Sequence, residues 1–88
     1  MVDRARTSWK VKRGLYFLAE FGEVTVDTND TVTFDTIDDA AGSLIRAHFI
    51  RKSTGAIVAC TEATNIATIS TAGLVDVPCV YVAYGVKA

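Results

Sequence analysis

The chain has 88 residues, enough for one domain and too few for a catalytic domain with a second module. Half of the residues are hydrophobic and 22% are charged, so the chain is too apolar for disorder and must bury a core. Nine basic residues against ten acidic residues leave a formal net charge of −1, which argues against general electrostatic binding to nucleic acid or to a membrane surface.

The start of the chain and the cysteines give a first expectation of its compartment. The first eight residues are polar and lack the apolar segment of a secretory signal, so we expect a protein that is not exported. No apolar run approaches the roughly 18 to 20 residues that a membrane-spanning helix needs. Cys60 and Cys79 could pair, but we expect reduced thiols that serve as small apolar side chains. Their spacing and number indicate neither redox nor zinc chemistry.

Eleven valines and eleven threonines, most of them in short alternating runs, predict an all-β domain. The odd-numbered positions of residues 15–21 are apolar, and we expect them to face the core, with Leu18 and Glu20 on the opposite face. Gly22 then predicts a bulge or bend before a strand over residues 23–27, whose two valines point inward.

The middle of the chain predicts a turn, a strand and a loop. Asn29 and Asp30 supply turn chemistry between residues 23–27 and the alternating run 31–35, so we expect these two runs to form a hairpin. Residues 38–43 show no alternation, and we interpret them as a loop that crosses a sandwich edge.

Alternation resumes over residues 44–52, with Ile45, Ala47 and Phe49 on one face. Further strands are expected over residues 56–61 and 66–71, separated from their neighbours by turns at Ser53-Thr54-Gly55 and Ala72-Gly73, with Pro78 marking the start of the last strand.

The last strand, residues 79–86, is apolar on both faces, which predicts a central strand or an outer face covered by another subunit. Six or seven strands in one short chain fit a small antiparallel β-sandwich or a partly open β-barrel. We therefore expect a basic N-terminal arm over residues 1–13 and a single all-β domain over residues 14–88.

A search for chemistry in the sequence yields no catalytic, cofactor-binding or metal-ligating set. The single histidine, His48, lies between basic neighbours without a carboxylate partner, and no serine stands in a nucleophile motif. The glycines form no phosphate-binding loop. Residues 27–32 begin like a calcium loop but have Val32 where glycine is needed, and Asp38 and Asp39 are neighbours in a loop. We expect a protein that is not an enzyme.

Charge is distributed unevenly along the chain. Residues 1–13 carry five basic residues and one acidic residue, whereas residues 20–39 carry seven acidic residues and no basic one. The arm could bind nucleic acid, or it could lie on an acidic protein surface, either a neighbour's 20–39 segment or a larger assembly. A solvated, frayed terminus is the third interpretation. If the arm docks on a partner, we expect its contacts to come from Arg4, Arg6, Trp9, Lys10, Lys12 and Arg13.

The layout resembles the small virion structural proteins of tailed bacteriophages, in particular capsid decoration or cement proteins. The matching features are the basic arm, the expected hairpin of residues 23–34, the short run Ala67-Thr68-Ile69-Ser70 and the ending 80–87. The resemblance implies a non-enzymatic β-protein of the virion, made in the host cytoplasm. Such a protein binds the major capsid protein or another virion protein, often as a homotrimer, and has no catalytic residues.

Self-association is also expected on physical grounds, because an 88-residue domain buries a small share of its unfolded surface. We expect the oligomer interface at Leu18, Tyr81 and Ala83. Two alternatives stay open. One is a single-stranded nucleic-acid-binding barrel with contacts from Trp9, Tyr16, Arg46, Arg51 and Lys52, and the other is a small accessory or inhibitor subunit.

Overall fold

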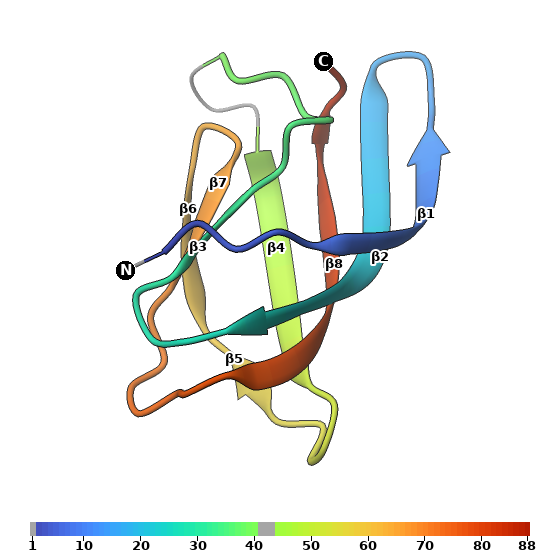
Figure 1. The fold of residues 1–88 in the computed structure, drawn as a ribbon. Coiled ribbons are helices and arrows are strands. Elements are labelled where there is room, and N and C mark those ends of the chain that lie inside the picture. Colours follow the sequence, from blue (N-terminus) through green and yellow to red (C-terminus); the bar gives the residue numbers. More distant parts are fainter. Residues whose placement is uncertain (1, 41–43) are drawn as a thin grey trace.

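The computed structural model describes residues 2–40 and 44–88, and these ranges contain strands and connecting turns without a helix (Figure 1). In chain order the strands are β1 (Thr7–Arg13), β2 (Phe17–Val26), β3 (Thr31–Thr33), β4 (Leu44–Arg51), β5 (Ile57–Val58), β6 (Cys60–Ala63), β7 (Ile66–Ile69) and β8 (Val77–Val86). The prediction of a small all-β fold is confirmed, with eight strands in the described residues where six or seven were expected.

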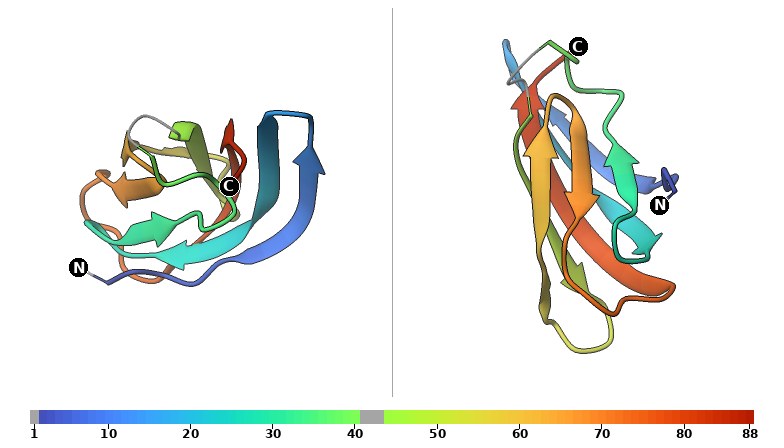
Figure 2. Two further views of the ribbon diagram at one scale, coloured as in Figure 1. Left: turned by 90° about the horizontal axis from the view of Figure 1, so that it is seen from above. Right: turned by 90° about the vertical axis from the view of Figure 1, so that its left-hand side faces the viewer.

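The strands form two antiparallel sheets that face each other (Figure 2). The larger sheet has five strands in the order β1-β2-β8-β4-β5, and the smaller has three strands in the order β3-β7-β6. The arrangement is an open sandwich and not a closed barrel, because no strand order closes on itself.

Strand β8 is the centre of the larger sheet, as its two apolar faces predicted. It pairs along its whole length with β2, from Val77 opposite Val26 to Val86 opposite Phe17. On its other side it pairs with β4, where Phe49 lies opposite Tyr81. A strand that is paired on both edges exposes few backbone hydrogen-bonding groups to water, which makes β8 the most constrained strand of the sheet.

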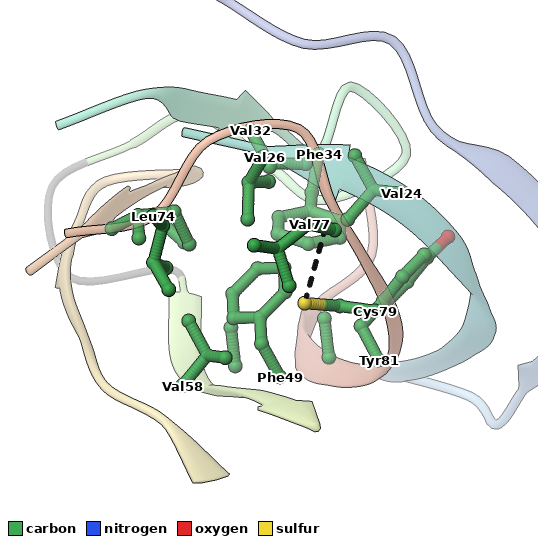
Figure 3. Close-up of a cluster of buried hydrophobic side chains, with 14 of the residues drawn as sticks. Val24, Val26, Val32, Phe34, Phe49, Val58, Leu74, Val77, Cys79 and Tyr81 are labelled. Carbon is green, nitrogen blue, oxygen red and sulfur yellow. Dashed lines mark hydrogen bonds between the residues drawn. The ribbon is translucent and has the colours of Figure 1, made fainter. Parts of the chain in front are cut away.

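The hydrophobic core lies between the two sheets and draws side chains from both (Figure 3). Phe34, which follows β3, packs against Tyr81 of β8 with ring centroids 5.5 Å apart, and Phe49 of β4 packs against the same tyrosine at 6.2 Å. The core is completed by aliphatic side chains, chiefly Val24, Val26, Val32, Ile37, Val58, Ile69, Leu74 and Val77. These contacts join the layers.

The facing of β2 differs from the prediction for residues 15–21. Even-numbered residues point inward throughout the strand: Leu18 and Glu20 are fully buried, whereas Phe17 and Phe21 are about 40% exposed. The alternation rule failed because a carboxylate occupies a core-facing position and two phenylalanines occupy the outer positions. The valines of residues 23–27 do point inward, as expected.

The turn at residues 28–30 is confirmed, but the predicted hairpin is wrong. Asn29 has φ +70, a left-handed conformation that asparagine tolerates. The strands on either side of it do not pair with each other: β2 belongs to the larger sheet and β3 pairs with β7 in the smaller. The turn therefore carries the chain from one layer to the other.

Most of the remaining predicted elements are confirmed, but the single strand expected over residues 56–61 is divided between β5 in the larger sheet and β6 in the smaller. Gly55 and Gly73 both have positive φ in their turns, at +74 and +76. Ala47 and Phe49 of β4 point inward, and Pro78 is the second residue of the last strand. Residues 38–40 form neither helix nor strand, and the rest of the predicted loop, 41–43, lies outside the described residues.

Gly22 permits a close approach and does not form a bulge in its own strand. Pairing of β2 with β8 is continuous through Gly22, and the irregularity lies opposite, in β1, where Trp9 is the additional residue between Ser8 and Lys10. A Cβ atom at Gly22 would collide with the carbonyl oxygen of Thr7 and lie 2.6 Å from the Tyr81 hydroxyl oxygen. Glycine is required here because the Tyr81 side chain crosses over this position.

We predict that Gly22→Ala lowers the free energy of unfolding by about 2 kcal/mol or more, because both neighbours of the added methyl group are held in place. Gly14→Ala is the matched control, since the nearest atom to its Cβ would be 3.7 Å away, and it should change stability by less than about 0.5 kcal/mol. Urea denaturation followed by Trp9 fluorescence measures both. Equal stability of the two variants would show that the region around Gly22 adjusts freely.

Candidate docking surface

The N-terminal segment lies across both sheets and is not a detached arm. The Thr31 backbone N–H donates to the Val2 carbonyl oxygen at 2.9 Å, and the Arg4 backbone N–H donates to the Thr31 carbonyl oxygen at 2.8 Å. These bonds attach residues 2–4 to the edge of β3. Residues 7–13 then form β1, an edge strand of the larger sheet. The predicted boundary at residue 13 therefore falls inside the β1–β2 hairpin.

Arg4 fixes the first part of this segment to a group of three aspartates. Its Nε donates to the Oδ2 atom of Asp30 at 2.6 Å, and its terminal nitrogen lies 3.2 Å from both Asp27 and Asp76. Asp30 is buried and also accepts hydrogen bonds from the backbone N–H groups of Val2 and Asp27. Burial opposes ionisation of Asp30, but these bonds outweigh it and lower the pKa of the carboxyl below its usual value.

Arg6 fixes the second part of the segment to Glu20, which is fully buried. The guanidinium donates to both carboxylate oxygens of Glu20, with a distance of 2.9 Å from the terminal nitrogen to Oε1. The Tyr81 hydroxyl donates to Oε2 at 2.5 Å, and the Thr36 hydroxyl donates to Oε1 at 2.9 Å. The guanidinium carbon also lies 4.9 Å from the centroid of the Phe34 ring.

The electrostatics of this buried cluster keep Glu20 charged and Tyr81 neutral. Desolvation opposes ionisation of Glu20, but the hydrogen bonds from Arg6, Tyr81 and Thr36 together lower the pKa of its carboxyl. Burial, followed by the bond to Glu20, raises the pKa of Tyr81 well above its usual value. The carboxylate receives four hydrogen bonds, so its acceptor sites are occupied and the cluster is suited to holding strands together.

The uneven charge of the sequence is therefore satisfied within one chain. Residues 1–13 do meet the acidic 20–39 segment, as charge complementarity suggested, but the contacts of Arg4 and Arg6 are intramolecular. These two arginines, predicted to dock on a partner, are already paired inside the molecule. Trp9, Lys10, Lys12 and Arg13, which belong to β1, are exposed.

The predicted oligomer interface is wrong. Leu18 and Ala83 are 0% exposed and Tyr81 is 4% exposed, because all three point between the sheets. They belong to the core of the single chain and present no surface to another subunit. The prediction failed because it assigned the wrong faces of β2 and β8 to the interior.

The exposed apolar residues lie instead on the opposite side of the larger sheet, the side that faces away from β3, β6 and β7. We call this side the outer face. Strand alternation and pairing place nine large apolar side chains on it: Trp9, Phe17, Phe21, Ile50, Ile57, Val80, Val82, Tyr84 and Val86. Six of them are between 38% and 79% exposed, which is unusual for one contiguous sheet face in water.

The centre of the outer face is a shallow hollow of about 350 Å³. Its wall is almost entirely apolar and is formed mainly by Trp9, Phe21, His48, Ile50, Val80 and Val82. His48 also packs against Tyr84, with ring centroids 6.1 Å apart. The hollow therefore offers aromatic and aliphatic contact area in the middle of the sheet.

Basic side chains surround this apolar centre. Lys10 and Lys12 lie on the outer face of β1, opposite Phe21 and Ala19 of β2. Arg46 lies on β4, and its side chain is 61% exposed.

The expected nucleic-acid contact set is brought together only in part. Trp9 and Arg46 share the outer face, and Lys52 is paired with Glu23 at 2.7 Å. Tyr16 lies at the tip of the β1–β2 hairpin and Arg51 faces the other side of β4.

The described residues offer little for other kinds of site. They contain no group of three or more His, Cys, Asp or Glu side chains placed to hold a metal ion. None of their segments is a helix of the length and apolarity needed to cross a bilayer. Cys60 and Cys79 are free thiols, and burial, followed by the charge of Glu62, raises the pKa of Cys60 to about 11. A thiol with such a pKa is a poor nucleophile.

Comparison with known proteins identifies no relative: no protein-family model, no curated protein and no solved structure matches the chain.

Replacing Arg6 tests the buried cluster. Arg6→Met leaves the Glu20 carboxylate buried without its cation, and we predict a loss of about 3 to 5 kcal/mol in the free energy of unfolding. Arg6→Met combined with Glu20→Gln removes the unpaired charge and should recover a large part of that loss. Chemical denaturation of the two variants measures the difference. If both variants unfold at the same denaturant concentration, the buried Glu20 carboxylate does not need the charge of Arg6 to be tolerated in the core.

Acid should weaken the fold through Glu20 and Asp30. Because both carboxyls have lowered pKa values in the folded state, the unfolded chain binds more protons as the pH falls below about 4. The stabilisation is complete above that pH and is lost as the pH falls through the folded pKa values. Urea midpoints between pH 7 and pH 3 should show this decline, and Glu20→Gln with Asp30→Asn should flatten it. An equally steep decline in the double variant would assign the effect to other carboxyls.

Proposed function

We propose that the protein is a non-enzymatic structural protein that self-associates through the outer face of its larger sheet. The observation that carries this proposal is the contrast between the two outward-facing surfaces of the sandwich. The outward positions of the smaller sheet carry threonines at positions 31, 33, 61 and 68 with only Ala63 and Ile66 beside them, whereas the larger sheet presents the apolar residues of the outer face. The chain thus builds a mainly polar surface on one layer and leaves the other suited to a contact.

A second copy of the chain is the occupant that we propose for the outer face. The five strands offer a broad apolar centre, with charged residues at its margin, which is the layout of a self-associating interface. Covering this face would also add buried apolar area to a domain that, because it is small, buries only a small share of its surface on folding. A repeated contact between different surfaces forms a ring when its rotation closes, and a trimer is the form that we favour.

The specific biological role that we propose is that of a capsid decoration or cement protein. Support comes from the resemblance of the sequence to small virion proteins of tailed bacteriophages and from the all-β sandwich expected of such a protein. In this role the oligomer binds the major capsid protein and stabilises the lattice by burying surface. Co-sedimentation with capsids assembled from the major capsid protein of the same genome tests this step directly.

Binding of single-stranded nucleic acid is a second candidate function, favoured by one observation. Trp9, Phe21 and His48 lie on the same face as Lys10 and Lys12, so bases could stack beside cations that contact phosphates. The aliphatic part of the face, from Ile50 to Val80 and Val82, has no role in stacking. We therefore place self-association first.

Light scattering tests the outer face. We predict that the purified protein is an oligomer, a trimer in the form that we favour, whose mass is the same at low and at high salt, because the proposed contact is apolar. Ile50→Glu places a charge beside the hollow and should yield monomers. Val75→Glu is the matched control: Val75 is 77% exposed in the loop before β8, and this variant should keep the native mass.

The outcomes separate the candidates. A monomer at both salt concentrations, or an Ile50→Glu variant that stays oligomeric, would overturn self-association through the outer face. Fluorescence anisotropy with a labelled single-stranded DNA then tests the second candidate, which requires micromolar or tighter binding that weakens steeply with salt.

A further inference from the structure

The β1 strand is the long free edge of the described sheets. It is the terminal strand of the larger sheet, seven residues long, and all seven residues are exposed. The opposite edge of that sheet is formed by β5, which has two residues, and by the part of β4 before Phe49, where the Ala47 N–H donates to Glu62. In the smaller sheet the edge of β3 is covered by residues 2–4 through backbone hydrogen bonds. An uncovered edge offers backbone donors and acceptors to an added strand.

The charge of this edge selects what can pair with it. Lys10, Lys12 and Arg13 give β1 three positive charges, and no ion pair involves any of them within residues 2–40 and 44–88. Two copies of β1 would place like charges opposite each other, which is destabilising. The lysines and the irregularity at Trp9 therefore oppose pairing of β1 with itself while leaving it open to an acidic strand.

The molecule already contains one contact of this kind, with the charges reversed. The segment around Arg4 adds to the edge of β3 by backbone hydrogen bonds at 2.8 and 2.9 Å. The guanidinium of Arg4 forms ion pairs with Asp30, Asp27 and Asp76. Edge addition of an extended segment with opposite charge is thus physically workable on this scaffold. At β1 the edge is basic, so the added segment must be acidic.

The spacing of the lysines gives the pattern of that segment. Lys10 and Lys12 are two residues apart and lie on the same face of the sheet, opposite Phe21 and Ala19. Residues directly opposite each other in neighbouring strands share a face, so the matching acidic residues must also be two apart. The chain's own acidic segment 35–39 does not supply this strand, because Ile37 at its centre is 1% exposed and packed in the core.

We propose that β1 is a docking edge for an extended acidic segment of a different protein, with acidic residues at alternate positions, which would extend the larger sheet by one strand. This contact is separate from self-association through the outer face, since it uses the edge of the sheet. It gives the protein a second surface, specific for a partner with an extended acidic segment.

The test is a titration of the ¹⁵N-labelled protein with a nine-residue peptide of alternating glutamate and valine, followed by NMR. We expect chemical-shift changes and slowed amide exchange concentrated in residues 7–13. A peptide of the same composition with its glutamates contiguous should bind at least severalfold more weakly. A peptide N-methylated at every residue should bind as weakly, because neither of its edges can donate the backbone hydrogen bonds of an added strand.

Two variants with the same loss of charge locate the contact. Lys10→Gln with Lys12→Gln should weaken binding about fivefold or more. Arg46→Gln with Lys52→Gln lies across the sheet and should change it less than twofold. Equal binding of all three peptides, equal effects of the two variants, tighter binding of a thymidine decanucleotide, or no binding at millimolar peptide would each overturn the proposal. The mass measured by light scattering is independent of these outcomes, so failure here and failure of self-association are distinguishable.

Discussion

The pairing of Arg6 with the buried carboxylate of Glu20 is the constraint on which the arrangement of the N-terminal half depends. A carboxylate inside a sheet sandwich is costly unless its oxygens are fully occupied. Here the four hydrogen bonds come from three parts of the chain: residue 6 before β1, Thr36 after β3 and Tyr81 in β8. One charged group thereby fixes the N-terminal segment, the central strand and the connection between the layers relative to one another.

This constraint also decides which charges face the solvent. Arg4 and Arg6 are used to neutralise acidic residues of the 20–39 segment, so the basic residues of the outer face come from β1 and β4. They lie beside an apolar sheet face, while Asp27, Asp30 and Asp35 are paired with the two arginines. The polarity visible in the sequence as two segments becomes, in the folded molecule, a difference between an outer face and the opposite layer.

The sequence allowed the fold class and much of the local structure to be predicted, because they depend on patterns within a few residues. Positive φ at Gly55 and the central position of β8 are examples. The facing of β2 could not be predicted by alternation, since its outer positions carry Phe17 and Phe21 while Glu20 lies inside. The partner of Glu20 is 14 residues away across a hairpin, and alternation contains no information on such a pairing. The misassigned interface followed from the same error, because the inner faces of β2 and β8 were exchanged with the outer ones.

The placement of phenylalanines outside and a glutamate inside is informative about function for a physical reason. For folding alone, the reverse assignment would bury more apolar area and would remove the cost of desolvating a carboxylate. A chain that accepts this cost gains a charged anchor for its N-terminal segment and a sheet face with exposed rings. The smaller sheet, whose outward positions carry four threonines with Ala63 and Ile66, shows that the same chain can build a mainly polar face. The apolar outer face is thus a property of these positions and not of the overall composition, and this is the physical argument for a role in assembly.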